Sequence, residues 1–146
     1  MMTRDESGLI GRRCARLVRI HHRLGGRVDM TRGPLEIEWD CGDITLIDAN
    51  TDWTLRVSSE RWIDPFAGRS PRELAILEHE VGLWLRFDVE DEDPLAPLVG
   101  RRLSWVEDQH NEVGELVGLM FDFEELRMQA YVLEGEIAIR LVNAGD

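Results

Sequence analysis

The chain has 146 residues, 43% of them hydrophobic, which is enough for one core without a disulfide framework. With 29 acidic and 17 basic residues the formal net charge is −12, and such a field disfavours nucleic acid as a ligand of the main body. No stretch approaches the ~20 apolar residues of a membrane-spanning helix, so we expect no membrane contact.

The charge is unevenly distributed. Residues 1–32 contain eight Arg and three acidic residues, a net charge of +5, so residues 33–146 carry −17. A negative field of this size speeds the encounter with a basic partner, and it also keeps a small protein soluble and monomeric. The sequence leaves both interpretations open.

The first part of the chain predicts an antiparallel meander. Residues 14–20 are compatible with a strand, and the glycine pair at 25–26 favours a tight turn after it. Residues 35–39 alternate apolar with acidic side chains, as in a strand with one wet face. Two further strands are expected near 44–46 and 53–57.

The middle of the chain predicts the one helix, over about residues 71–81. Ser70 is a suitable N-cap, Pro71 fits the first helical position, and Glu73 completes a capping box. We expect this helix to cover one face of a sheet. A strand over 83–89 should follow it.

An acidic run from Asp88 to Asp93 then leads into a proline-containing stretch, which predicts an exposed linker. Beyond it, strands are expected near 102–107, 115–123, 125–131 and 136–142.

A pattern of apolar residues occurs twice. Residues 35–46 recur, 82 positions on, as residues 117–128, and Gly-Arg-Arg precedes each copy at Gly11 and Gly100. Repetition of alternating apolar positions indicates a duplicated three-stranded unit. We therefore predict an α+β, predominantly β fold, in which two pseudo-repeated antiparallel meanders and the central helix share a core. Residues 1–146 would form a single domain, with repeats at about 11–62 and 100–146 joined by a connecting segment, 63–99.

The repeat also predicts which side chains form that core. The inward positions are expected to be Leu35, Ile37, Trp39, Ile44, Leu46, Leu55, Val57, Val117, Leu119, Phe121, Leu126, Met128, Ile139 and Leu141.

Signatures of catalysis and metal binding are weak. His21 and His22 are adjacent, so on a strand they point to opposite faces and are poorly placed to chelate one ion. Cys14 and Cys41 lie in apolar patterns and are expected to be buried free thiols. We predict no catalytic residues, no metal site and no cofactor, and hence not an enzyme.

The repeat also aligns two pairs of charged residues. Asp40 and Asp122 would either cap their turns or form a pseudo-symmetric acid pair, and the turn interpretation is favoured. Arg56 and Arg140 would pair with carboxylates of neighbouring strands.

The candidate partner-binding residues combine the acidic run with two tryptophans. Most charge runs are solvated loops, but carboxylates of this density also form docking surfaces for basic proteins. Trp is favoured at interfaces, and Trp84 alternates with Leu83 and Leu85, so it would lie either on a partly exposed face or buried beneath the helix. The candidates are Asp88, Glu90, Asp91, Glu92, Asp93, Trp84 and Trp105.

Four segments resemble small acidic bacterial immunity proteins of polymorphic toxin systems. They are residues 52–57, the Trp62–Phe66 stretch, Gly82–Trp84 and Leu98–Arg102. The resemblance implies a protein that binds a basic partner, the cognate toxin domain, and neutralises the toxin by covering its active site. The polar start of the chain predicts a cytoplasmic location. Two alternatives remain open: a small-ligand binder or hydrolase with a pocket between the repeats, and a protein that self-associates, for example as a homodimer, through strand edges.

Overall fold

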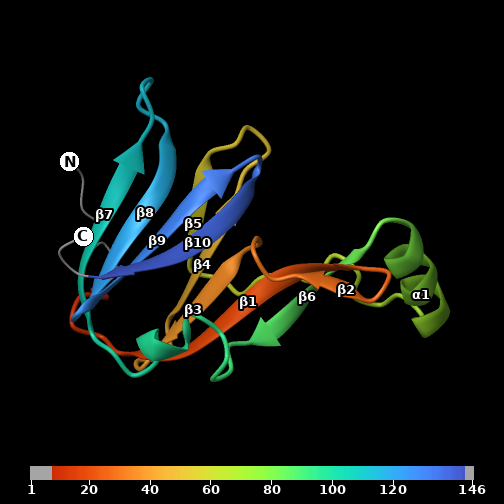
Figure 1. Ribbon diagram of the computed structural model, residues 1–146, viewed down its shortest axis with the longest axis horizontal. Helices are drawn as coiled ribbons and strands as arrows, with labels where there is room; N and C mark the ends of the chain where they lie inside the picture. The colour runs from red at the N-terminus through yellow and green to blue at the C-terminus, as the bar shows by residue number, and fades with distance from the viewer. Residues whose placement is uncertain (1–7, 144–146) are drawn as a thin grey trace.

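The computed structural model describes residues 8–143, and these residues form two antiparallel sheets and one α-helix (Figure 1). The predicted α+β, predominantly β fold class is confirmed. The first sheet contains β1 (Cys14–Leu24), β2 (Arg27–Asp29), β3 (Leu35–Trp39), β4 (Ile44–Ala49), β5 (Leu55–Ser58) and β6 (Leu83–Asp88). The second contains β7 (Leu103–His110), β8 (Leu116–Phe123), β9 (Leu126–Leu133) and β10 (Glu136–Asn143).

Both sheets are built around a four-stranded meander. In the first sheet β1, β3, β4 and β5 are neighbours in that order. The strand β2 pairs with the end of β1 on the same edge as β3, and β6 pairs with the opposite edge of β1. The second sheet has the order β10-β9-β8-β7. The strands β1, β3, β4 and β5 therefore follow one another as β7, β8, β9 and β10 do. What distinguishes the first sheet is the insertion of β2 and the addition of β6, both on β1.

One hydrophobic cluster lies between the sheets, and both supply it. The Trp39 and Phe123 rings stack across it with centroids 5.9 Å apart. The fully buried members include Leu17, Leu35, Ile37, Trp39, Ile47, Leu98, Leu103, Leu119, Phe123 and Met128. Single bridges, Arg13 with Arg102 and Arg32 with Ala138, also link the two halves of the chain.

Most residues expected in the core are buried there, but β4 turns the opposite face to the core from the one predicted. Leu46 pairs with Glu36 on the face away from the core, whereas Ile47 pairs with Leu35 and belongs to the core cluster. The reason is the register of the hairpin: Ile37 pairs with Thr45, whereas its repeat equivalent Leu119 pairs with Ala130 and not with Arg127, a shift of three residues. An odd shift in register moves every side chain to the other face, so Leu46 and Met128 are not equivalent.

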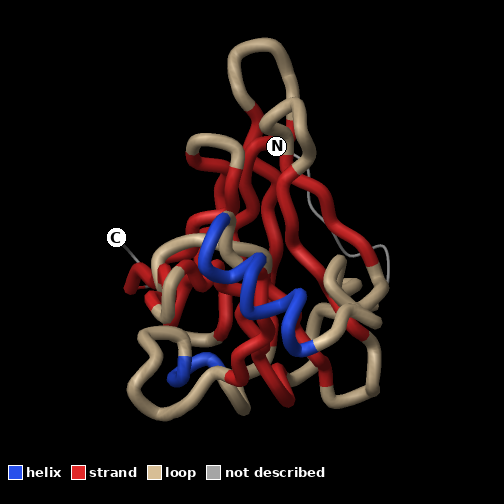
Figure 2. Tube along the Cα trace, turned by 90° about the vertical axis from the view of Figure 1, so that its right-hand side faces the viewer, coloured by secondary structure: helices blue, strands red, loops and turns tan. Residues whose placement is uncertain are grey.

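The helix α1 (Pro71–Glu80) begins as predicted, with the Glu73 amide donating to the Ser70 hydroxyl oxygen at 3.2 Å. It has no buried residue, so the expectation that it shares the core is wrong. It lies at the far end of β1, β2 and β6, and Figure 2 looks onto this end. The other helical element is the short 3-10 turn η1 (Ala96–Leu98).

The two cysteines lie in different surroundings, and this corrects the expectation that both are buried. Cys14 is buried at the start of β1, and burial raises the pKa of its thiol to about 12. Cys41 is exposed because it occupies the turn between β3 and β4. We expect a thiol-specific chromogenic reagent at pH 8 to react with one thiol in the native protein and with two in denaturant. Reaction of the native Cys41→Ser variant would contradict this assignment.

Candidate functional site

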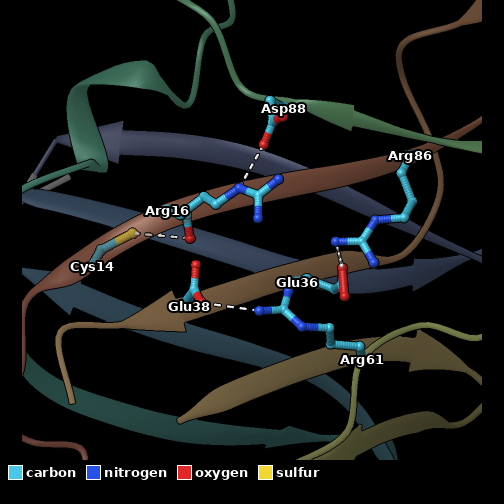
Figure 3. A network of polar contacts seen from close by, with 7 residues as sticks. All are labelled: Cys14, Arg16, Glu36, Glu38, Arg61, Arg86 and Asp88. Atoms are coloured by element: carbon cyan, nitrogen blue, oxygen red, sulfur yellow. Dashed lines mark hydrogen bonds and ion pairs between the residues drawn. The ribbon is translucent and has the colours of Figure 1, made fainter. Parts of the chain in front are cut away.

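Three ion pairs occupy the outer face of the first sheet, the face that points away from the core (Figure 3). Arg16 Nε lies 2.7 Å from Asp88 Oδ1 and joins β1 to β6. The Glu38 carboxylate of β3 is 3.0 Å from Arg61 Nη2. These two pairs are substantially exposed, so each contributes little to stability. Their main effect is to fix the direction of the side chains on this face.

The third ion pair, between Glu36 and Arg86, is more deeply buried than the other two. The Glu36 side chain is 1% exposed, and its Oε2 lies 2.9 Å from Arg86 Nη2 of β6. Its other oxygen accepts a hydrogen bond from the Trp62 backbone amide at 3.2 Å. Glu36 thus holds the crossing segment, residues 59–70, which runs from β5 to α1 over the outer face. This cover explains why Leu46, which lies beside Glu36, is buried.

The acidic loop, residues 88–93, leaves the end of β6. Its last member, Asp93, points inward: the side chains of Asp93 and Arg19 are each 8% exposed, and their charged atoms lie 3.2 Å apart. Asp93 Oδ1 also accepts the Leu95 amide at 2.9 Å. The other end of the loop is held by the Val89 amide, which donates to the Leu17 carbonyl at 3.0 Å. Asp93 is therefore structural, and the prediction of a wholly exposed linker is wrong at this position.

The middle of the acidic loop has the opposite character. Glu90, Asp91 and Glu92 are all exposed. Within residues 8–143 no ion pair to these three carboxylates is found. The loop therefore presents three negative side chains from a backbone that is fixed at both ends.

The two candidate tryptophans lie on different sheets. Trp84 is on β6, on the same face as Asp88, and its ring centroid is 5.1 Å from that of His22. It is partly exposed, which is the first of the two expected placements. Trp105 lies on β7, opposite Asp122, and is 42% exposed. Trp84 therefore shares β6 with the first residue of the acidic loop, whereas Trp105 lies on the other sheet.

Next to Trp84 is a cavity of about 220 Å³, called here the aromatic pocket. The pocket draws on five separate segments of the chain, Trp84 among them, so no local sequence pattern predicts it. Besides Trp84, only the Trp62–Phe66 stretch stood out beforehand. The pocket is lined by Gly33, Pro34, Asp48, Ala49, Trp62, Ile63, Pro65, Trp84, Gly135, Glu136 and Ile137.

A second cavity, of about 420 Å³, lies on another side of the junction between the two halves of the chain. Its walls include Arg19, Arg32 and Arg140, together with Tyr131. The Arg140 guanidinium carbon lies 5.9 Å from the Tyr131 ring centroid. This basic cavity contrasts with the acidic loop, although two of its arginines are already paired, Arg19 with Asp93 and Arg32 with Glu134.

The aligned charged pairs are only partly equivalent. Asp122 pairs with Arg127 across the β8–β9 hairpin at 2.9 Å, whereas Asp40 is exposed in its turn. The prediction for Arg56 is confirmed, because it lies 3.2 Å from Asp48 of the neighbouring strand. Arg140 instead donates to the Gln129 amide oxygen at 2.7 Å.

Comparisons with protein-family models, with curated proteins and with solved structures find no match to this chain. Among residues 8–143, no group of three or more His, Cys, Asp and Glu side chains is arranged to hold a metal ion. The same residues contain no helix of the length and apolar character that crossing a membrane requires. Within the described residues, the acidic loop and the outer face are the features that point to a function.

Proposed function

We propose that this protein is a non-catalytic, cytoplasmic interaction protein that binds a basic protein partner, and that it acts as an immunity-type inhibitor of a bacterial toxin domain. One observation carries the proposal: Glu90, Asp91 and Glu92 are exposed on a loop whose ends are tied down by the Val89 amide and by the buried Arg19–Asp93 pair.

Fixed carboxylates suit a binding role for two reasons. A loop that is already ordered loses less conformational freedom when a partner docks, so more of the contact energy appears as affinity. Negative charges at the edge of an interface also raise the association rate with a basic surface. The overall charge of −12 acts in the same direction. Repulsion of phosphate groups makes nucleic acid a poor alternative partner.

The test is binding to the protein encoded by the gene immediately upstream, where the proposal places the toxin. Binding is measured once with the acidic loop intact and once with its charges neutralised. The triple variant Glu90→Gln, Asp91→Asn and Glu92→Gln changes the formal charge from −12 to −9. We expect wild-type protein to form a tight complex and the triple variant to associate about tenfold more slowly at low salt. The difference should shrink in 0.5 M salt, because screening removes long-range attraction.

A control of equal charge separates the loop from the net field. Glu80, Glu112 and Glu125 are exposed and lie outside the acidic loop, so changing all three to Gln gives the same net charge. The control should associate within about twofold of wild type. An equal loss of rate in both triple variants would contradict the role of the loop. Failure of wild-type protein to bind the gene product, or to protect cells that express it, would overturn the proposal.

The second candidate is small-ligand binding, and the basic cavity favours it. Its volume of about 420 Å³ lies within the roughly 300–1,000 Å³ of small-molecule sites, and three arginines line it. An anionic ligand fits that lining. A rise in Tm with millimolar inorganic phosphate or citrate, without any protein complex, would favour this function over inhibition.

A further inference from the structure

The aromatic pocket carries an inference that rests on the proposed function and names one contact within it. Two indole side chains, Trp62 and Trp84, form part of its lining, together with Pro34 and Pro65. The same pocket holds two carboxylates, Asp48 and Glu136. Aromatic rings combined with carboxylates are the surroundings that a cation prefers, because ring faces and carboxylate oxygens both attract positive charge.

The carboxylates are positioned but only partly compensated. Asp48 Oδ1 accepts the Ala49 amide at 2.8 Å, and Oδ2 lies 3.2 Å from the exposed Arg56. Burial nevertheless raises the pKa of Asp48, which means that its negative charge is poorly stabilised where it lies. Glu136 is 4.0 Å from Arg32, at the limit of an ion pair. An added cation would therefore be attracted to both groups.

The size of the pocket restricts the occupant. At about 220 Å³ it is smaller than the roughly 300–1,000 Å³ cavities that hold small molecules. One long side chain is of a suitable size. Among cationic side chains, arginine is the better fit, since its planar guanidinium stacks on aromatic rings and binds carboxylates through two parallel hydrogen bonds.

The position of the pocket connects it with the acidic loop. Trp84 and Asp88 lie on the same face of β6, four residues apart, which is about 13 Å along a strand. A protein interface of ordinary size covers roughly 800 Å² on each partner, so one partner can contact the loop and the pocket together. We propose that the aromatic pocket binds an arginine side chain of the basic partner. This contact anchors the complex, and the acidic loop speeds its association.

The first test uses the wild-type protein and a defined probe. The blocked peptide acetyl-Gly-Arg-Gly-amide is titrated while the indole N–H signals are followed by NMR, each assigned with a Trp→Phe variant. We expect millimolar binding that shifts the signals of Trp62 and Trp84, with Trp39 and Trp105 unchanged. The matched peptide with citrulline in place of arginine keeps the shape and loses the charge, and should bind at least about tenfold more weakly. Equal binding of both peptides, or no shift at about 50 mM, would overturn the inference.

A conservative variant tests the carboxylate. Asp48→Asn keeps the side-chain shape and should weaken binding of the arginine peptide about fivefold or more. Glu112→Gln removes one charge far from the pocket, in the β7–β8 turn, and should leave binding unchanged. Equal weakening by both variants would contradict a direct contact at Asp48.

The two proposals fail in different ways. If the neighbouring gene product binds, and the triple change in the acidic loop slows it, but Asp48→Asn and the arginine peptide have no effect, the pocket inference alone is wrong. If the peptide binds as described and the gene product does not, the proposed function is wrong and the pocket remains a cation site.

Discussion

Replacing Asp93 with alanine is expected to lower the free energy of unfolding by about 3–5 kcal/mol, measured by urea denaturation at pH 7. The Arg19 and Asp93 side chains are both 8% exposed and pair at 3.2 Å, so removing the carboxylate leaves a buried guanidinium without its counter-ion. The variant also loses the acceptor of the Leu95 amide. Both effects destabilise the turn that connects the acidic loop to η1.

Two further variants identify the cause. Asp91→Ala changes an exposed acid of the same loop, and its effect should stay within about 0.5 kcal/mol. The double variant Arg19→Met with Asp93→Ala removes both charges and should recover more than half of the loss, because apolar replacement of a whole buried pair is often close to neutral. A double variant as unstable as Asp93→Ala alone would show that the loss comes from the turn and not from the orphaned charge.

Replacing Gly33 with alanine is expected to cost about 3–5 kcal/mol. Gly33 has φ +132°, and a Cβ there would overlap the backbone carbonyl oxygen of Ile20 and crowd the Trp84 ring at 3.2 Å. Backbone cannot move aside as a flexible side chain can. Gly33 also donates to the Ile137 carbonyl at 2.8 Å, so displacement would separate the first sheet from β10 and open the aromatic pocket.

The control for this substitution is Gly42, which has φ +92° and no atom within 4 Å of the Cβ position. Gly42→Ala should cost only the roughly 1–2 kcal/mol of a left-handed backbone conformation. The difference between the two variants, measured by thermal or urea unfolding, isolates the steric overlap. Equal losses of unfolding free energy in the two variants would mean that the overlap with the Ile20 carbonyl oxygen does not affect stability.

The fold could be predicted from the sequence where local patterns decide the structure. Alternation in 35–39 and the capping box at Ser70 lead to β3 and α1 without knowledge of the rest of the chain. The apolar pattern predicts Leu46 on the core face, but the β3–β4 hairpin pairs in a register three residues away from that of the β8–β9 hairpin, and the pattern alone does not reveal the register. Leu74 and Leu77 lie on one stripe of the helix and predict a core-facing surface, yet no residue of α1 is buried.

The candidate site was harder to predict because its parts depend on long-range contacts. In the sequence, the acidic residues from Asp88 to Asp93 look alike. Only the fold distinguishes Asp93, because it pairs with Arg19 of β1 while its neighbours are exposed. Trp84 and Trp105 are both predicted as partner contacts, but Trp105 lies on the other sheet. The aromatic pocket combines residues from 33 to 137, and no local spacing indicates such a combination.

The helix at the end of β1, β2 and β6 has a consequence for how such a chain can evolve. Because α1 contributes no buried residue, its sequence is free to drift without weakening the packing between the sheets. Within residues 8–143 the second meander carries no comparable addition. A lineage could therefore change the elements appended to β1 while the two four-stranded meanders stay under ordinary selection for folding.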